Sequence, residues 1–477
     1  MAEKFPYWIA GRAASSSDVV DVRSPYDGAL AGSTSNASAE DVEQAVALAD
    51  HARPAMAHLP AYVRAAALDH VSQRLAQRSE EIAALITAES GKPIKWARVE
   101  VTRGVSTFRW AAEEARRFTG EVQRLDTDPS SAGRLALVRR IPRGPVLGIT
   151  PFNFPLNLVA HKVAPAIAAG CPIIVKPAPA TPLTALLLGQ LLAETDLPAG
   201  SWSVLPLPNE AAGALVTDPR LPVVSFTGSG PVGWSIRDRV PRKHVTLELG
   251  GNAAAVVCPD WIDLDAAAQR IATFAMYQAG QSCISVQRVY AHRDVYPQLV
   301  DRVVSHVGVL RTGDPADPST DVGPLINEAA ALRVKSWVDD AVTAGATVLT
   351  GGTREDASVT PTVLVDAGED CAVNAEEIFG PVLTIAPVES VEEAFQRINA
   401  SRYGLQAGVF THDIALAFRA AAVLEVGGVI VGDVPSYRAD QMPYGGIKDS
   451  GTGREGVRAA MDDFTEPRVL VLTGVSV

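Results

Sequence analysis

The hydrophobic and polar positions along the chain divide it into a helical first part and a later part in which strands and helices alternate. A capping box at Ser38 and Asp41 predicts a helix whose apolar positions share one face: Val42, Ala45, Val46 and Ala49. A second helix is predicted over 63–90, where a glycine and then a proline follow as a stop signal. A third is predicted over 94–118, and its charged residues indicate a solvated face.

From Gly144 onward, short apolar runs alternate with helical stretches. The predicted strands of this part cover 145–150, 172–177, 201–207 and 221–228. Such alternation is typical of an α/β fold with a doubly wound parallel sheet that binds ligands at the strand ends. Beyond a likely boundary at Gly250-Gly251, a second α/β alternation runs to about Val431, and a C-terminal strand is predicted over 467–475.

The segment 120–143 breaks this pattern. Two alternating stretches flank a turn built from Pro129, two serines, an alanine and Gly133, which predicts a projecting β-hairpin. The residues alone leave open whether this hairpin joins subunits or is a surface flap without partners.

Length, charge and cysteine content restrict the class of protein. A chain of 477 residues is too long for one core, so two or three domains are expected. The net charge of −12 argues against nucleic acid and anionic membranes as partners. No apolar run is long enough for a signal peptide or a membrane span. The four cysteines lack metal-ligand spacing, so we expect no metal site, free thiols and a cytoplasmic location: Cys171, Cys258, Cys283 and Cys371.

Two residues on glycine-rich backbone are candidates for catalysis. A strand-like run delivers Glu248 to the Gly250-Gly251 turn, and Cys283 follows Gly280 in a loop of small residues. A thiolate can attack an electrophilic carbon and a carboxylate can then deprotonate water. Residue types alone leave open a buried core cysteine and a glutamate at a strand end.

The motifs ELGGN at 248–252 and GQSC at 280–283 resemble the active-site pair of the aldehyde dehydrogenase superfamily, and further motifs extend the resemblance over essentially the whole chain. The resemblance implies an aldehyde dehydrogenase-like α/β fold, with a Rossmann-type cofactor domain, a second α/β catalytic domain and an oligomerisation element made of the hairpin and the C-terminal strand. The corresponding boundaries are 1–122 with 142–250, then 251–455, then 123–141 with 456–477.

The resemblance also assigns the chemistry. TPFNFP at 150–155 is similar to a family motif in which Asn153, with the backbone N–H of Cys283, forms an oxyanion hole. Cys283 is then the nucleophile that forms a thioester, and Glu248 activates the water that releases the acid. Lys162 matches a lysine near the family's active site, where it relays protons, orients groups or supports the fold.

A glycine-rich turn at 227–233 fits the pattern GxGxxG, which by itself would assign Glu248 to a cofactor ribose. The resemblance instead makes this turn phosphate-proximal and leaves Glu248 catalytic. It implies NAD or NADP, held by Thr150, Pro151, Phe152, Lys176, Gly228, Ser229, Gly233, Leu249, Glu377 and Phe379. Pro179 stands where many NAD-using relatives carry glutamate, which leaves the choice open; the lack of an extra arginine beside Lys176 favours NAD slightly.

Three cationic residues are candidates for the substrate tail: His161, Arg288 and Arg438. For the arginines, an ordinary surface salt bridge is the alternative. Together they suggest a small aldehyde with an anionic or hydroxylated tail, as in the branch of lactaldehyde, phosphonoacetaldehyde and non-phosphorylating glyceraldehyde-phosphate dehydrogenases. Gly432 stands where relatives commonly have asparagine, which is expected to loosen a loop at the substrate mouth.

The resulting hypothesis is an NAD(P)-dependent aldehyde dehydrogenase that oxidises a small polar or anionic aldehyde to its acid, assembled as a homodimer or homotetramer. One alternative is CoA-acylating or reductive chemistry on the same fold, which loss of Glu248 would favour. The other is a non-catalytic binding protein, which would be expected to have lost Cys283, Asn153 or Glu248. All three residues are present.

Overall fold

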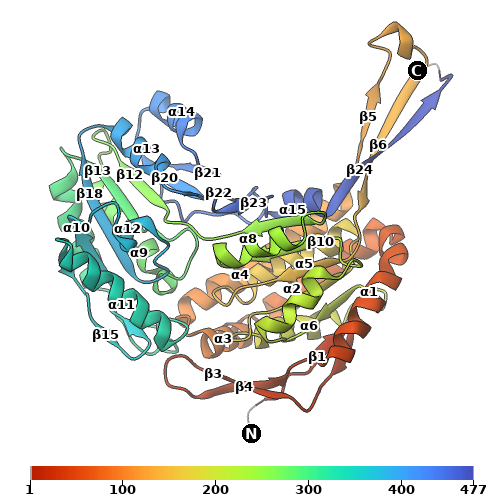
Figure 1. The fold of residues 1–477 in the computed structure, drawn as a ribbon, viewed down its shortest axis with the longest axis horizontal. Helices are drawn as coiled ribbons and strands as arrows, with labels where there is room; N and C mark the ends of the chain where they lie inside the picture. The colour runs from red at the N-terminus through yellow and green to blue at the C-terminus, as the bar shows by residue number, and fades with distance from the viewer. Residues whose placement is uncertain (1–2, 476–477) are drawn as a thin grey trace.

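The computed structural model describes residues 3–475, which form two large sheets and a projecting arm (Figure 1). The first sheet has eight strands in the order β2-β1-β9-β8-β7-β10-β11-β23. Its five central strands, β9, β8, β7, β10 and β11, are parallel to one another. This confirms the predicted doubly wound sheet. The strand bounds are β1 Tyr7–Ile9, β2 Arg12–Ala14, β7 Val146–Ile149, β8 Ile173–Lys176, β9 Trp202–Val204, β10 Val223–Thr227, β11 His244–Glu248 and β23 Gly451–Thr452.

Helices cover both faces of this sheet and complete the first core. Helix α5 is buried along its whole length because its sequence is apolar on nearly every side. The helix bounds are α1 Ala39–His58, α2 Ala61–Gln77, α3 Ser79–Ser90, α4 Ile94–Arg117, α5 Asn157–Ala169, α6 Leu183–Leu192, α7 Ala212–Thr217 and α8 Gly230–Arg239.

The second sheet has seven strands in the order β14-β17-β18-β13-β12-β20-β21 and its own core. All neighbours are parallel except β14 and β17. The strands are β12 Ala254–Val257, β13 Arg288–His292, β14 Thr347–Thr350, β17 Thr362–Val365, β18 Val382–Val388, β20 Gln406–Phe410 and β21 Gly428–Val431. The helices are α9 Leu264–Met276, α10 Tyr296–Gly308, α11 Glu328–Thr343, α12 Ala372–Ala375, α13 Val391–Asn399 and α14 Ile414–Val423.

The predicted hairpin is present and forms the arm seen in Figure 1. Strand β6 (Arg134–Pro142) lies between β5 (Glu121–Arg124), with which it forms four residue pairs, and the C-terminal strand β24 (Thr465–Thr473), with which it forms nine. Helix α15 (Val457–Phe464), which precedes β24, packs into the first core instead of the arm. The short strand β23 likewise joins the first sheet, as the antiparallel neighbour of β11.

One expectation about the first part of the chain is wrong. The predicted single helix over 63–90 is two helices, α2 and α3, because Arg78 leaves the helical conformation (φ −106°, ψ 23°). Because of this break, α2 and α3 can both pack against α4. The helical periodicity of the sequence does not reveal such a break, since both helices have apolar positions at the same spacing. The stretch before α1, for which the sequence pattern predicts no element, contains β1, β2, β3 (Val19–Arg23) and β4 (Leu30–Ser35). No helix among residues 3–475 is long and apolar enough to cross a bilayer.

A buried ion pair fixes the start of α5, which carries several site residues. Lys92 and Glu100 are fully buried and pair with one another. The second carboxylate oxygen of Glu100 accepts hydrogen bonds from the backbone N–H groups of Leu156 (2.9 Å) and Asn157 (3.1 Å). The carboxylate therefore satisfies donors that the first turn of a helix leaves without partners.

We expect Glu100→Ala to lower the free energy of unfolding by about 3–5 kcal/mol, because it leaves the Lys92 ammonium buried without its partner. Glu113→Ala, on the exposed face of the same helix, is the matched control and should change it by about 0.5 kcal/mol or less. Thermal and urea unfolding of both variants measure the difference. Equal stabilities would contradict this role for Glu100.

Candidate active site

The carboxyl ends of β7, β10 and β11 meet the loop before β13 around a cavity of about 290 Å³. The cavity is lined by Pro151, Phe152, Asn153, Leu158, Thr227, Gly228, Ser229, Glu248, Leu249, Gly250, Cys283, Arg333, Glu377 and Phe379. A second, smaller cavity begins on the other side of Cys283 and contains Arg103, Tyr277, Arg438 and Tyr444 among its lining residues. Cys283 therefore lies between two spaces, as a nucleophile between two reactants would.

The loop that presents Cys283 has an unusual backbone. Gln278, Ala279 and Gly280 all have positive φ angles, of 56°, 53° and 70°. A side chain at Gly280 would place its Cβ only 1.9 Å from the backbone oxygen of Gly380. Left-handed backbone at consecutive non-glycine positions is costly and is found mainly at functional sites.

The Cys283 sulfur lies 2.8 Å from the hydroxyl oxygen of Tyr444. Burial raises the pKa of the thiol to about 11. Among the described residues, the backbone N–H of Cys283 has no hydrogen-bond acceptor. The side-chain nitrogen of Asn153 donates to the carbonyl of Gln281 at 2.8 Å, which holds this amide beside the nucleophile loop. Two donors are thus close to the sulfur, as an oxyanion hole requires.

Glu248 is the last residue of β11 and is 2% exposed. Neither of its carboxylate oxygens has a hydrogen-bond partner among residues 3–475. Burial, and after it the negative charge of Glu455, raise the pKa of Glu248 well above its ordinary value. A buried carboxyl with free oxygens and a raised pKa is suited to accept a proton from water.

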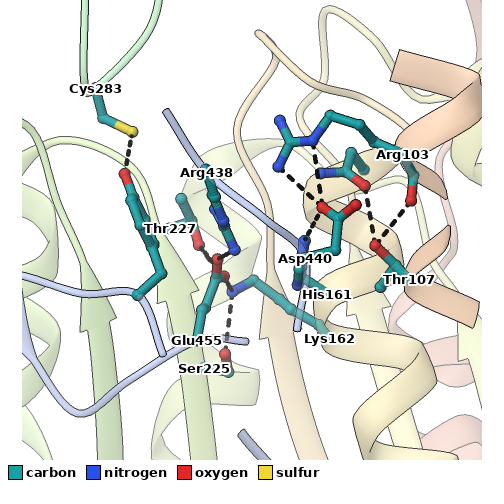
Figure 2. A network of polar contacts seen from close by, with 12 residues as sticks. Arg103, Thr107, His161, Lys162, Ser225, Thr227, Cys283, Arg438, Asp440 and Glu455 are labelled. Atoms are coloured by element: carbon teal, nitrogen blue, oxygen red, sulfur yellow. Dashed lines mark hydrogen bonds and ion pairs between the residues drawn. The ribbon is translucent and has the colours of Figure 1, made fainter. Parts of the chain in front are cut away.

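A buried polar network lies behind these groups (Figure 2). The Lys162 ammonium donates to the hydroxyls of Ser225 (3.0 Å) and Thr227 (2.8 Å) and to the Glu455 carboxylate (3.2 Å). The other oxygen of Glu455 accepts from Arg438 at 3.0 Å. Although burial opposes it, the charges of Lys162 and Arg438 lower the pKa of Glu455 to about 2.

A second branch of the network surrounds Asp440. One oxygen of its carboxylate accepts from Arg103 at 3.0 and 3.2 Å and lies 3.2 Å from Nε2 of His161. Burial lowers the pKa of His161 to about 4, so its ring is neutral at pH 7 and donates to Asp440. His161 therefore lies behind the cavity and braces an acidic residue, and it does not line the cavity as predicted.

Most of the cofactor candidates line the larger cavity: Pro151, Phe152, Gly228, Ser229, Leu249, Glu377 and Phe379. Glu377 is half-buried beneath Gly250, where a Cβ would come within 1.9 Å of its carboxylate, and it accepts from the N–H of Gly251 at 3.2 Å. Burial raises the pKa of Glu377 to about 7. The Lys176 ammonium, at the end of β8, donates to Asn209 at 2.6 Å, and burial lowers its pKa to about 8.

Aromatic and close-packed contacts shape the same cavity. The rings of Phe152 and Phe379 meet edge to face with centroids 5.9 Å apart. A Cβ at Gly233 would lie 2.5 Å from Leu249, so only glycine allows α8 to approach the end of β11 this closely. Ser229 precedes the first residue of α8, whose N-terminal N–H groups are suited to an anionic phosphate.

Comparison with known proteins places this geometry in a family. Residues 12–470 match the description "Aldehyde dehydrogenase family". The chain is 40% identical over 471 residues to a 3-sulfolactaldehyde dehydrogenase of Priestia aryabhattai, covering 98% of each chain. The chain belongs to the aldehyde dehydrogenase family.

Solved structures agree with this assignment. One is an aldehyde dehydrogenase 21 from Physcomitrella patens in complex with the reaction product succinate. It is 45% identical to this chain and has a TM-score of 0.98, and the match covers 100% of this chain and 99% of that one. An NADP-dependent glyceraldehyde-3-phosphate dehydrogenase from Bacillus halodurans, complexed with NADP, is 34% identical with a TM-score of 0.95, over 99% of this chain and 100% of that one. The predicted family and fold are therefore confirmed.

The predicted site residues of this aldehyde dehydrogenase fall into two groups, those that lie at a cavity and those that do not. Cys283, Glu248, Asn153 and the nicotinamide-end candidates line one cavity, while Lys162 and Thr150 lie beside it. Arg288 does not reach either cavity, because its guanidinium is bound by Asn252 and Tyr290. Gly432 follows β21 and lines neither cavity, and a Cβ added there would meet Trp261. Arg288 and Gly432 are therefore not proposed to bind the substrate.

Sequence reasoning did not identify several residues that line or support the site: Arg103, Arg333, Tyr277, Tyr444 and Glu455. Arg103 comes from the middle of α4, a helix whose charges were assigned to a solvated face. The motif around Tyr444 was visible as a glycine-rich segment, but nothing in it indicated contact with a thiol. Within residues 3–475, no group of three or more His, Cys, Asp or Glu side chains is arranged to hold a metal ion.

We expect Glu455→Gln to lower the thermal unfolding midpoint strongly at pH 7 and much less at pH 3. Because the folded pKa of Glu455 is about 2, below the ordinary 4.5, its carboxylate stabilises the fold above pH 4.5 and this contribution is lost as the pH falls from 4.5 towards 2. Thermal melts of both proteins from pH 7 to pH 3 measure the gap. Glu392→Gln, an exposed carboxylate on α13, is the control, and a gap independent of pH would contradict the ion-pair role.

Proposed function

We propose that this aldehyde dehydrogenase oxidises a small anionic aldehyde to its carboxylic acid with NAD or NADP, through a thioester on Cys283. The observation that carries the proposal is that Cys283, Glu248 and Asn153 line one cavity, where the N–H of Cys283 has no acceptor among residues 3–475. A nucleophile, a general base and two oxyanion donors are the groups that acyl transfer to water requires.

The residues act in sequence. The Cys283 thiolate attacks the aldehyde carbon, and the Asn153 amide and the Cys283 N–H donate to the oxygen that becomes negative. A nicotinamide held at Phe152 and Phe379 would supply the hydride acceptor that turns the adduct on Cys283 into a thioester. Glu248 then takes a proton from water, which attacks the thioester carbon, and the bond to sulfur breaks to release the acid. The low pKa of Glu455 and the raised pKa of Glu248 assign the proton-accepting role to Glu248.

Residues of the larger cavity fit a dinucleotide. Gly250 leaves room that a side chain would fill above Glu377, whose carboxylate can accept hydrogen bonds from ribose hydroxyls. Ser229 and the start of α8 suit the pyrophosphate, and Lys176 suits the adenosine ribose or its phosphate. Phe152 and Phe379 give the nicotinamide end an apolar, edge-to-face wall. The NADP-bound relative supports the same assignment.

The smaller cavity favours an anionic tail. Arg103 and Arg438 line it. With the residues that pair with them behind the cavity, they form a network of three cations and two carboxylates of lowered pKa, which has one excess positive charge: Arg103, Lys162, Arg438, Asp440 and Glu455. Nε of Arg438 is buried without an acceptor among the described residues. The volume of the smaller cavity, about 40 Å³, suits a short substrate tail. Relatives named for a sulfonated aldehyde and solved with succinate also handle anionic compounds.

The presence of Glu248 favours hydrolysis of the thioester over transfer to CoA, and the complete catalytic set favours an enzyme over a binding protein. The four cysteines are free thiols, which suits a reducing compartment such as the cytoplasm. We also keep the division into 1–122 with 142–250, 251–455 and 123–141 with 456–477 as a proposal, with the exception of α15, which packs into the first core.

We further propose a homodimer or homotetramer in which the arm joins subunits. Strand β24 is an edge strand, and it exposes a run of apolar side chains: Val469, Leu470, Val471 and Leu472. An exposed apolar edge strand is a ready template for pairing with another chain.

We expect Glu248→Gln to give a burst of about one equivalent of reduced cofactor per subunit, followed by turnover at least about 100-fold slower. The substitution keeps the side-chain size and removes the base, so the thioester forms and its hydrolysis slows. Stopped-flow absorbance of the nicotinamide measures both phases, with NAD and with NADP. Cys283→Ala is the control and should give no burst. Rapid steady turnover by Glu248→Gln would contradict the mechanism.

We expect Arg438→Met and Arg103→Met to lower kcat/KM for succinic semialdehyde by about thirtyfold or more relative to butanal, which has the same length and no carboxylate. The ratio of the two substrates is the readout, because general damage to the site affects both. Arg288→Met is the matched control, since that arginine does not reach the cavity, and it should leave the ratio unchanged. An unchanged ratio in both test variants would exclude the anionic-tail proposal and leave the oxidation itself untouched.

A further inference from the structure

Tyr444 touches the reactive sulfur. It lies in the loop before β22 (Ile447–Lys448), is 3% exposed, and its hydroxyl oxygen is 2.8 Å from Sγ of Cys283. The dashed line from the Cys283 sulfur in Figure 2 marks this contact, which is the sulfur's single hydrogen bond among the described residues. We propose that Tyr444 is a further catalytic residue, whose hydroxyl donates a hydrogen bond to the Cys283 sulfur and stabilises it as a thiolate.

The direction of this hydrogen bond follows from the state of the sulfur. A neutral thiol and a phenol can each donate to the other, but a thiolate has no hydrogen, so the phenol must donate once Cys283 ionises. Burial, and after it the neighbouring thiolate, raise the pKa of Tyr444 well above its ordinary value. Tyr444 therefore keeps its proton at neutral pH and remains a donor when the sulfur becomes negative.

The tyrosine ring is held so that its hydroxyl stays on the sulfur. The Arg438 guanidinium lies over the ring face, 3.9 Å from its centroid. Ile284 and Leu405 pack against Tyr444. Its backbone exchanges two hydrogen bonds with Glu455, of 2.9 and 2.7 Å. A phenol fixed by its backbone and by its ring face loses little freedom when it donates.

The charges around the sulfur explain why such a donor is needed. The groups that face Cys283 are Tyr444, Arg438 and the carboxyl groups of Glu377 and Glu248. Burial and the carboxyl groups disfavour a thiolate, whereas Arg438 and Tyr444 favour it. Of the two favourable groups, Tyr444 makes the direct hydrogen bond, and the hydrogen bond of Arg438 goes to Glu455. The same donor can stabilise the sulfur again when the thioester breaks and the thiolate departs.

Alkylation of Cys283 by iodoacetamide tests the proposal, because the thiolate attacks the reagent's carbon and displaces iodide. Tyr444→Phe removes the hydroxyl and keeps the ring. We expect its alkylation rate at pH 7 to fall by about tenfold to a hundredfold, the effect of one hydrogen bond to a charged group. The midpoint of its rate–pH profile should rise accordingly. Peptide mass spectrometry assigns the reaction to Cys283, since the half-buried Cys371 can also react.

Tyr296→Phe is the matched control, because its hydroxyl lies on α10 and makes no hydrogen bond among the described residues, so its profile should match the parent. Replacing Tyr444 with 3-fluorotyrosine gives a more acidic phenol and a stronger donor, and should move the midpoint to lower pH. This variant decides the question if Tyr444→Phe does not fold. A midpoint that neither change at Tyr444 moves would show that the ring only packs against Cys283 and would overturn the proposal. Because alkylation requires neither aldehyde nor cofactor, this outcome is independent of the proposed function.

Discussion

The site depends on one buried carboxylate, Glu455, and the two cations that it holds. Lys162 comes from α5, and Arg438 comes from the segment between the second sheet and the first. Removing one of these charges would leave its partner buried and unpaired, which is costly. The two ion pairs therefore hold together segments that are distant in the chain. Lys162 also donates to Thr227 at the end of β10, and Arg438 packs over the ring of Tyr444, whose hydroxyl contacts the Cys283 sulfur.

The pKa values of two buried carboxyl groups, Glu455 and Glu248, are shifted in opposite directions. Glu455 has two cationic partners and stays ionised, whereas Glu248 has no hydrogen-bond partner among the described residues and holds a proton more readily. A pair of acids whose environments push their pKa values apart is the usual way in which one site separates a structural charge from a general base. The division of roles is therefore set by neighbours and not by residue type.

Cys283 is placed by backbone that few residues tolerate. Gly280 approaches Gly380 too closely for any side chain, and Gln278 and Ala279 adopt left-handed conformations before it. Such backbone persists only when its surroundings over-determine it. Here the side chain of Gln281 contributes, because its amide donates to the carbonyl of Gln278 and its oxygen accepts from Ile326. The loop thus holds Cys283 where it lines both the larger and the smaller cavity.

The sequence by itself determined the alternation of strands and helices, the hairpin, and the motifs around Cys283, Glu248 and Asn153, because local periodicity and short spacings carry that information. It did not reveal the break at Arg78 or the early strands, where packing against distant elements outweighs local pattern. Only the tertiary structure decided which charges face the site. It brought Arg103 and Tyr444 to the sulfur side, set His161 behind Asp440 and removed Arg288, because contacts between residues hundreds of positions apart have no local signature.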